Sequence, residues 1–332
     1  NLEGDSRVTN AIKHWEENTK FVFVERTFQN DYVEFRSVDK GCYASVGRQG
    51  GKQYINIASG CSTGNTIHEI GHTIGLWHTQ SRSDRDNFVE IDFDNIRDDK
   101  DHNFKTYEEQ DLEGQDIGSY DVRSIMHYGS YAFCKRNSSD NCVGPTITKL
   151  DGTTFSAQRS ALRSSDVRNA KRMYKKELRE DCIRFRKNGL RIRRSRSGYT
   201  VTDGRNRMLK FSNYREAQKS IRIMKELNMS YQCFVGRPNA SLHYFLSSGR
   251  NAPTGTVRGG EDCIRFGDNL RVIRERRGGK RTYTLVSDRS RLFYFNTKKD
   301  EAFKALATIK RHGFTKSCYH KRPNPSFRYL KK

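Results

Sequence analysis

A histidine motif at residues 68–78 constrains the fold of this 332-residue chain more than any other feature. It places His68, Glu69 and His72 in one segment, followed by Gly75 and His78. Because a helix advances about 100° per residue, His68 and His72 lie on one face, one turn apart. Gly75 lets the chain leave the helix through a backbone conformation that other residues resist. The motif therefore predicts a helix whose exit turn brings His78 back towards the first two histidines.

Three neutral imidazoles with one position left for water form the ligand set of a catalytic zinc ion. Glu69, beside the first ligand, is placed to accept a proton from that water and to pass it to a leaving amine. Two other interpretations are ordinary helix histidines and a purely structural zinc site. The coincidence of all five residue types argues against the first, and three histidines with an adjacent glutamate favour catalysis over the second.

These residues match the metzincin pattern, in which a methionine turn follows the histidine motif. Residues 124–128, with Met126 and Tyr128, supply that turn. Together with the run from Trp77 to Asp86, the motif resembles the astacin family specifically. The resemblance covers about residues 1–175 and implies an α+β fold: a two-lobed zincin domain with a mixed twisted sheet and the active-site helix above the cleft.

The resemblance also implies roles for residues outside the motif. Met126 would form the hydrophobic floor beneath the metal, and Tyr128 would be a displaceable zinc ligand whose hydroxyl stabilises the oxyanion. Strand alternation should point His127 elsewhere. Arg159 lies where related enzymes place an arginine near the pocket for the residue after the cut, so charge pairing would favour an acidic residue there. A plain surface arginine is the alternative for Arg159.

Three departures from the family stand out. Family members carry a glutamate directly after the third histidine, which receives the N-terminal ammonium of the mature enzyme, whereas this chain has Thr79. Lys20 stands where a family cysteine usually lies. The usual strand before the first helix is missing, so the chain begins like a processed product or a fragment. With Thr79 at this position, the family's contact between that glutamate and the N-terminal ammonium is not expected in this chain.

Periodicity predicts the regular elements of residues 1–177. Apolar residues at helical spacing predict helices over residues 7–15 and 165–178, in addition to the motif helix. Alternating or short apolar runs predict strands over residues 21–24, 32–35 and 53–57. The acidic stretch over residues 92–101 lacks the spacing of a calcium loop and is expected to be a solvated loop.

The chain has eight cysteines and no pair separated by two residues, which argues against a zinc–cysteine site and for disulfides in an oxidising, extracellular setting. We therefore predict a secreted protein. An internal repeat suggests two of the pairings, and the remaining four cysteines are left as local pairs. One of these, Cys42–Cys61, also matches a disulfide typical of the astacin family. The predicted disulfides are Cys182–Cys233, Cys263–Cys318, Cys42–Cys61 and Cys134–Cys142.

The repeat organises the second half of the chain. Residues 180–185 recur unchanged as residues 261–266, and an amphipathic helix precedes the second cysteine of each copy. Each copy is therefore expected to be a small disulfide-stapled α+β module. The predicted organisation is a catalytic domain over residues 1–177, a first basic module over 178–246, a linker over 247–260 and a second basic module over 261–332.

Charge separates the same two regions. Residues 1–175 contain 23 Lys and Arg against 26 Asp and Glu, whereas residues 176–332 contain 39 against 13. Three interpretations compete for residues 178–332: binding to anionic polysaccharide or acidic matrix, binding to nucleic acid, and a soluble spacer with incidental charge. The disulfides argue against an intracellular role with nucleic acid.

The sequence thus predicts a secreted zinc endopeptidase that acts on protein substrates, with one catalytic Zn²⁺ and a basic C-terminal region that anchors it. No apolar run is long enough to span a bilayer. The alternative is an adhesion or polyanion-binding protein in which the protease activity is secondary. The intact Glu69 and Tyr128 argue against that alternative.

Overall fold

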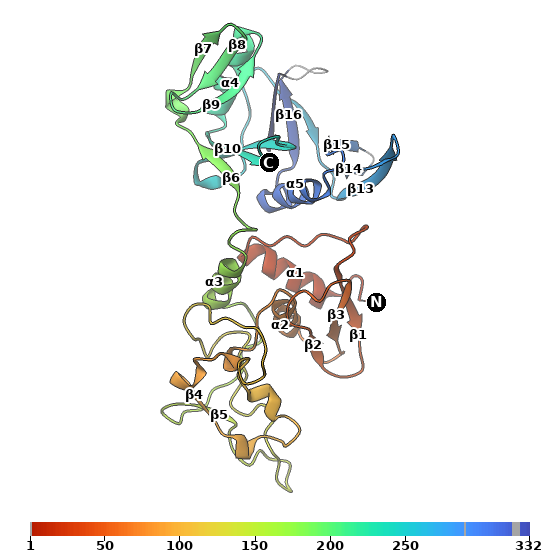
Figure 1. Cartoon of the computed structure of the whole chain (residues 1–332), viewed down its shortest axis with the longest axis vertical. Helices are drawn as coiled ribbons and strands as arrows, with labels where there is room; N and C mark the ends of the chain where they lie inside the picture. Colours follow the sequence, from red (N-terminus) through yellow and green to blue (C-terminus); the bar gives the residue numbers. More distant parts are fainter. Residues whose placement is uncertain (1, 289, 321–325) are drawn as a thin grey trace. The chain divides into compact units, whose positions relative to one another are not determined.

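The computed structural model describes residues 2–288, 290–320 and 326–332, and the chain divides into two compact units (Figure 1). The first unit comprises Asn1–Phe21 and Gln29–Leu178, and the second comprises Val22–Phe28 and Arg179–Lys332. No helix within the described ranges is long and apolar enough to cross a membrane.

The first unit contains a mixed sheet and two packed helices. Strand β3 lies in the middle of the sheet, parallel to β1 and antiparallel to β2. Helix α1 buries one face, and the indole of its Trp15 donates a 3.0 Å hydrogen bond to Ile67 O of α2. The helices and strands of this unit are α1 Ser6–Asn18, β1 Tyr32–Ser37, β2 Cys42–Ala44, β3 Lys52–Ile57, α2 Thr63–Thr73, β4 Val89–Ile91, β5 Ile147–Lys149 and α3 Ser164–Met173.

Between α2 and α3 the chain has little regular structure, and a small core holds it together. Strands β4 and β5 pair antiparallel, and Val89 and Ile147 on them pack with Ile96 and Phe104. Tyr128 packs against this cluster. The segment that carries the methionine turn is therefore fixed by side-chain packing rather than by a long strand.

The strand expected at residues 21–24 is wrong. These residues have no regular secondary structure. Val22–Phe28 instead belong to the second unit, where the ring of Phe28 lies 5.7 Å from that of Tyr283 and 5.5 Å from that of Phe303. Side-chain contacts, not strand pairing, thus bury this short apolar run.

The second unit contains one order of elements twice: a strand, three strands, a helix and two strands. In each set, the first strand pairs with the two strands that follow the helix to form one three-stranded sheet. The three strands before the helix form another. The elements are β6 Asp181–Arg184, β7 Arg191–Ser195, β8 Gly198–Thr202, β9 Arg207–Phe211, α4 Tyr214–Glu226, β10 Met229–Val235, β11 Leu242–Ser247, β12 Asp262–Arg265, β13 Leu270–Arg277, β14 Lys280–Ser287, β15 Ser290–Tyr294, α5 Lys299–His312, β16 Lys316–His320 and β17 Phe327–Lys331.

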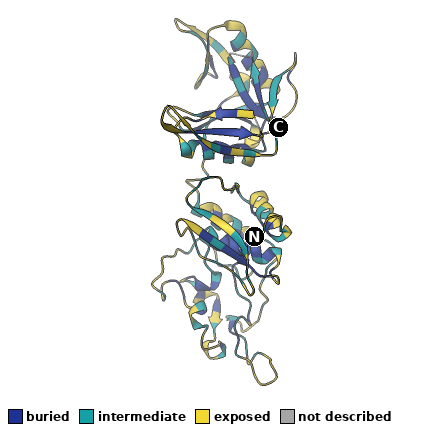
Figure 2. Ribbon diagram, turned by 90° about the vertical axis from the view of Figure 1, so that its right-hand side faces the viewer, coloured by how far each residue is buried: buried dark blue, intermediate teal, exposed yellow. Residues whose placement is uncertain are grey.

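Two hydrophobic cores connect these two sets of elements (Figure 2). Alternate residues of β11 enter different cores: Tyr244 lies in the core that contains residues of α5, and Phe245 lies in the core that contains residues of α4. The segment expected to be a linker is packed as well, because Ala252 joins the first core and Val257 the second.

Four disulfides pair all eight cysteines. In the second unit each disulfide joins residues that face each other across antiparallel strands, β6 with β10 and β12 with β16. The pairs are Cys42–Cys61, Cys134–Cys142, Cys182–Cys233 and Cys263–Cys318.

Candidate metal centre

Helix α2 positions the first two histidines of the motif. It begins with a capping box, in which Ser62 Oγ accepts a hydrogen bond from Asn65 N and Asn65 Oδ1 accepts one from Ser62 N. His68 and His72 follow one turn apart and are 5% and 6% exposed. The cap therefore fixes where the helix begins, and the helical period brings both imidazoles to the same buried face.

Gly75 turns the chain back after the helix ends at Thr73. Its φ of +106° lies in a region that other residues rarely adopt. The turn brings Nε2 of His78 to 3.1 Å from Nε2 of His72 and 3.2 Å from Nε2 of His68. Tetrahedral nitrogen ligands at about 2.0–2.1 Å from zinc are about 3.3–3.4 Å apart. The three nitrogens thus stand close to the spacing that one zinc ion requires.

Backbone carbonyl groups fix the tautomers of two of these histidines. Nδ1 of His68 lies 2.8 Å from Ile125 O, and Nδ1 of His72 lies 2.8 Å from Leu76 O. Since a carbonyl oxygen only accepts, each Nδ1 carries the hydrogen and each Nε2 presents a lone pair. Lone pairs at this separation repel one another unless a cation lies between them. The three nitrogen donors therefore fit Zn²⁺. The backbone carbonyl groups orient the rings of His68 and His72 through their Nδ1 atoms.

Burial keeps the three imidazoles neutral. It lowers the pKa of His72 to about 4 and holds the pKa values of His68 and His78 well below their usual range. The positive charge of Arg159 acts in the same direction on all three. At neutral pH each histidine therefore keeps the lone pair that a metal ligand needs.

The methionine turn packs directly against the motif helix. A Cβ atom at Gly71 would lie 2.8 Å from Sδ of Met126, so glycine is required for this approach. Met126 itself is 2% exposed. Gly71 and Met126 thus contact each other beside the histidines.

Asp166 on α3 holds this turn in place. Its carboxylate accepts hydrogen bonds from Ser124 Oγ and, at 3.2 Å, from Ile125 N. Ile125 O in turn receives the Nδ1 hydrogen of His68. A chain of hydrogen bonds thus runs from α3 to the first ligand. The sequence reasoning missed Asp166, because its only local signal is its place in the first turn of an expected helix.

We expect Asp166→Asn to weaken zinc binding by about tenfold to a hundredfold, the usual cost of disturbing the partners of a metal ligand. An amide nitrogen cannot accept the bonds that the second carboxylate oxygen accepts, so the turn and Ile125 O would shift. Competition with a chromophoric chelator measures the affinity. Ser165→Ala is the matched control, because the Ser165 hydroxyl bonds Asp121 instead. An affinity within twofold of the wild type in Asp166→Asn would contradict this positioning role.

Glu69 is a buried carboxylate with unused hydrogen-bonding capacity. It is 3% exposed, and its Oε2 has no hydrogen-bond partner within the described ranges. Burial raises the pKa of Glu69 to about 8, while the charge of Arg159 and a backbone hydrogen bond from Ala44 oppose that rise. A buried oxygen without a partner is costly, so Oε2 marks a place for a water molecule or a substrate group.

Tyr128 lies against the third histidine. Its ring centre is 4.4 Å from that of His78. Burial raises the pKa of Tyr128 to about 12, so its phenol is a neutral donor at physiological pH. The neighbouring His127 points away from the histidine cluster: its Nδ1 hydrogen bonds Tyr128 O, and its Nε2 accepts from Tyr120 OH at 2.7 Å.

Arg159 lies beside the same site because of a close backbone approach. A Cβ atom at Gly64 would lie 1.5 Å from Arg159 O, so glycine lets the start of α2 touch this segment. The guanidinium donates to His127 O at 2.9 Å and to Gln158 O at 2.8 Å. Burial lowers the pKa of Arg159, and the nearby Tyr128 and Glu69 oppose that shift.

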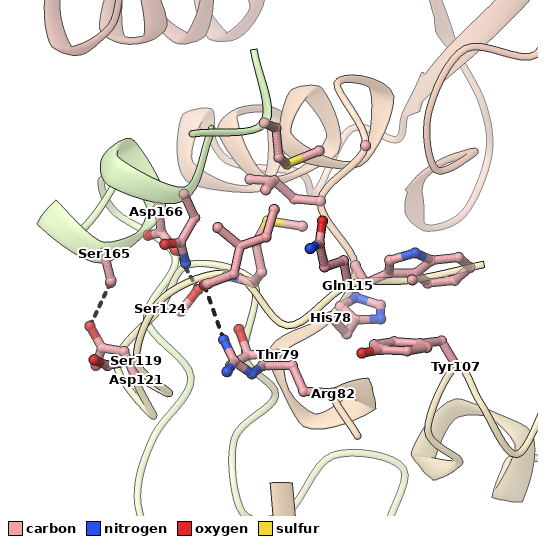
Figure 3. A pocket seen from close by; sticks show the side chains of 18 of the residues that line it. His78, Thr79, Arg82, Tyr107, Gln115, Ser119, Asp121, Ser124, Ser165 and Asp166 are labelled. Carbon is pink, nitrogen blue, oxygen red and sulfur yellow. Dashed lines mark hydrogen bonds between the residues drawn. The ribbon is translucent and has the colours of Figure 1, made fainter. Parts of the chain in front are cut away.

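A cavity of about 440 Å³ adjoins His78 and Thr79 (Figure 3). Three carboxylates line it: Asp121 accepts a hydrogen bond from Ser165, Asp166 accepts one from Ser124, and Glu113 is exposed. Thr79 contributes no carboxylate here, and its backbone N donates to Met126 O at 3.0 Å. The residue directly after the third histidine therefore supplies no carboxylate to this cavity.

Comparison with known proteins identifies relatives of the first half of the chain. The sequence model of the Astacin peptidase family matches residues 2–175. Blastula protease 10 of Paracentrotus lividus is 38% identical over 188 residues, which are 53% of this chain and 30% of that protein. Bone morphogenetic protein 1 of Xenopus laevis is 37% identical over 188 residues, 53% of this chain and 25% of that protein. The chain therefore spans less than a third of the length of these relatives.

A solved structure is also similar to part of the chain. High choriolytic enzyme 1, a hatching enzyme zinc-protease from the medaka fish Oryzias latipes, is 30% identical with a TM-score of 0.46. The match covers 51% of this chain and 82% of that one.

Proposed function

The chain belongs to the astacin family of zinc metallopeptidases, and from that premise we propose that it cleaves protein substrates with Glu69 as the general base. The observation that carries this proposal is the convergence of three neutral imidazoles, two buried and one half-buried, beside a buried carboxylate with an unpartnered oxygen. His68, His72 and His78 would hold the zinc ion. When bound, the ion supplies Lewis acidity, which makes water a stronger acid and a peptide carbonyl a better electrophile.

The residues around the ion divide the remaining work. The positive charge of a bound zinc ion would lower the raised pKa of Glu69 and favour its carboxylate form. Its Oε2, which has no hydrogen-bond partner within the described ranges, would then take the proton of the attacking water and return it to the leaving amine. Tyr128, a neutral phenol beside His78, would donate a hydrogen bond to the oxyanion that develops on the scissile carbonyl. Met126 supports the histidines from below through its contact with Gly71.

Cleavage of a peptide library by the full chain tests this function. The wild type is expected to cut internal peptide bonds, and both Glu69→Ala and a zinc chelator are expected to abolish cutting. Trimming of single residues from peptide ends, with no internal cleavage, would argue against an endopeptidase.

A preference for an acidic residue after the cut follows from the state of Arg159. No carboxylate within the described ranges forms an ion pair with its guanidinium, which bonds only to carbonyl oxygens. A largely buried cation gains most from a charged partner, and a substrate carboxylate would provide a bidentate one.

We expect Arg159→Gln to reduce kcat/KM for substrates with Asp or Glu after the cut by about tenfold to a hundredfold, the value of one charged hydrogen-bonded pair. Substrates with alanine at that position should change much less, because they leave the guanidinium unpaired in both proteins. Matched peptides that differ only at this position measure the ratio. An unchanged ratio would remove Arg159 from the specificity pocket.

Secretion and anchoring complete the proposal. The four disulfides favour an oxidising compartment, so the chain would act outside the cell. The strongly basic residues 178–332, as two related modules, would hold the protease on an anionic polysaccharide or acidic matrix. Salt-dependent retention of the full chain on immobilised heparin tests the anchoring. If adhesion were the main role, Glu69→Ala would leave the biological effect unchanged.

A further inference from the structure

A cavity of about 650 Å³ in the second unit is lined by basic side chains. It lies between the loop after β6, the β8–β9 turn and the start of β10. Arg184, Arg186, Lys187 and Arg205 contribute four cations to its lining. Asn188, Asn206 and Ser230 add neutral hydrogen-bonding groups.

The backbone already uses the one carboxylate in this lining. Asp203 accepts hydrogen bonds from the backbone N–H groups of Arg186 at 3.1 Å, Arg205 at 3.0 Å and Asn206 at 2.7 Å. These bonds tie the two loops together and hold the side chains of Arg186 and Arg205 at the same cavity. In the part of the chain that the structure describes, no carboxylate forms an ion pair with any of the four cations. The cavity therefore places four positive charges against the single negative charge of Asp203.

The second copy of the repeat lacks two of these cations. Residues 265–266 repeat the Arg–Phe pair of residues 184–185, and the next two positions are Gly267 and Asp268 instead of Arg186 and Lys187. There, Gly267 N bonds the hydroxyl of Ser287. The second copy therefore forms its first strand and the loop after it without basic side chains at these two positions, so the charges of Arg186 and Lys187 call for another explanation.

We propose that this cavity binds the sulfate groups of a sulfated polysaccharide, with Arg184, Arg186 and Arg205 as the main contacts. The inference rests on the proposed anchoring role of residues 178–332 and assigns its site. Guanidinium groups present several N–H donors in a fixed fork, which suits an oxyanion with several acceptor oxygens. The cavity is open to an extended chain rather than reserved for a small ion, because all three arginines are exposed.

The aromatic residues of the lining favour a polysaccharide over a single-stranded nucleic acid. Binding of unpaired bases relies on exposed aromatic faces for stacking. Phe185 is 3% exposed, and the guanidinium of Arg250 lies 5.3 Å from the centre of the Tyr231 ring. Neither ring offers a free platform. The disulfides also place the chain where sulfated polysaccharides, not nucleic acids, are the usual polyanions.

The test measures binding of a heparin octasaccharide to the full chain by calorimetry. We expect the double variant Arg186→Gln/Arg205→Gln to raise Kd by about tenfold or more, since two charged contacts are lost. The slope of log Kd against log salt should also fall by about two, one for each cation removed. Lys187→Asp, which places the residue of the second copy here, should weaken binding as well. Thermal unfolding checks that each variant folds.

The matched control is Arg276→Gln/Arg281→Gln. These arginines face each other across the β13–β14 hairpin, both are exposed, and they remove the same net charge. We expect the control to change Kd by less than about threefold, because only long-range attraction is lost.

The outcomes separate this proposal from the anchoring role. Equal weakening in the two double variants would leave the anchoring role standing and overturn the cavity as its site. No binding of heparin by the wild type would overturn both. A single-stranded oligonucleotide that binds as tightly, and loses affinity equally in Arg186→Gln/Arg205→Gln, would identify a nucleic-acid site instead. Inorganic sulfate that binds as tightly as the octasaccharide would show that the cavity takes a free anion.

Discussion

Glu69→Ala is expected to lower kcat by about a hundredfold to ten-thousandfold, the range attributed to a positioned general acid–base group. The protein should still bind one zinc ion, because the three ligand nitrogens belong to His68, His72 and His78. The physical reason is the unpartnered Oε2 of Glu69, which is available to accept the proton of an attacking water. Peptide cleavage and zinc content, measured on the same preparation, check both parts.

Two companion variants sharpen this prediction. Glu90→Ala removes an exposed carboxylate on β4 and should leave kcat unchanged. Tyr128→Phe should lower kcat by about tenfold to a thousandfold if the phenol donates to the oxyanion. An active Glu69→Ala with more than about a tenth of the wild-type kcat would remove Glu69 as the base, since general catalysis contributes at least a hundredfold. Loss of zinc from this variant would mean that Glu69 supports the ligands instead.

His72→Ala should lose both zinc and activity. The two remaining imidazoles leave the ion without a third histidine ligand. Zinc affinity should therefore fall by more than about a hundredfold, which is the upper cost of changing a residue that only orients a ligand. Zinc content after dialysis against a buffered metal solution provides a readout that does not depend on catalysis. His102→Ala is the matched control, because His102 is exposed and contacts Asn103 rather than the cluster. Full zinc content in His72→Ala would contradict the ligand assignment.

The metal centre was the most predictable part of the molecule, for a physical reason. The helical period places His68 and His72 on one face, and Gly75 indicates where the helix ends. These are local relations over eleven residues, so the sequence contains them in full. Asp166 is different: it reaches the turn at Ser124 from a helix some forty residues further along. No local spacing reveals such a partner.

The sequence is a poorer guide where the burial of a segment depends on residues far away in the chain. Residues 21–24 look like a strand because the run is short and apolar, yet Val22–Phe28 are part of the second unit, where Phe28 packs against Tyr283. The repeat indicates two similar modules, but it cannot show that Tyr244 and Phe245, neighbours on β11, enter different cores. The composition of residues 247–260 suggests a free linker, although Ala252 and Val257 are buried.

The central claim is that His68, His72 and His78 hold one zinc ion on which peptide cleavage depends. The most direct test strips the wild-type chain with a chelator and titrates Zn²⁺ back while cleavage is followed. We expect no cleavage by the stripped chain, then a linear rise that saturates at about one equivalent of zinc per chain, the stoichiometry of a three-histidine catalytic site. Cleavage at the wild-type rate by the metal-free chain would contradict this claim.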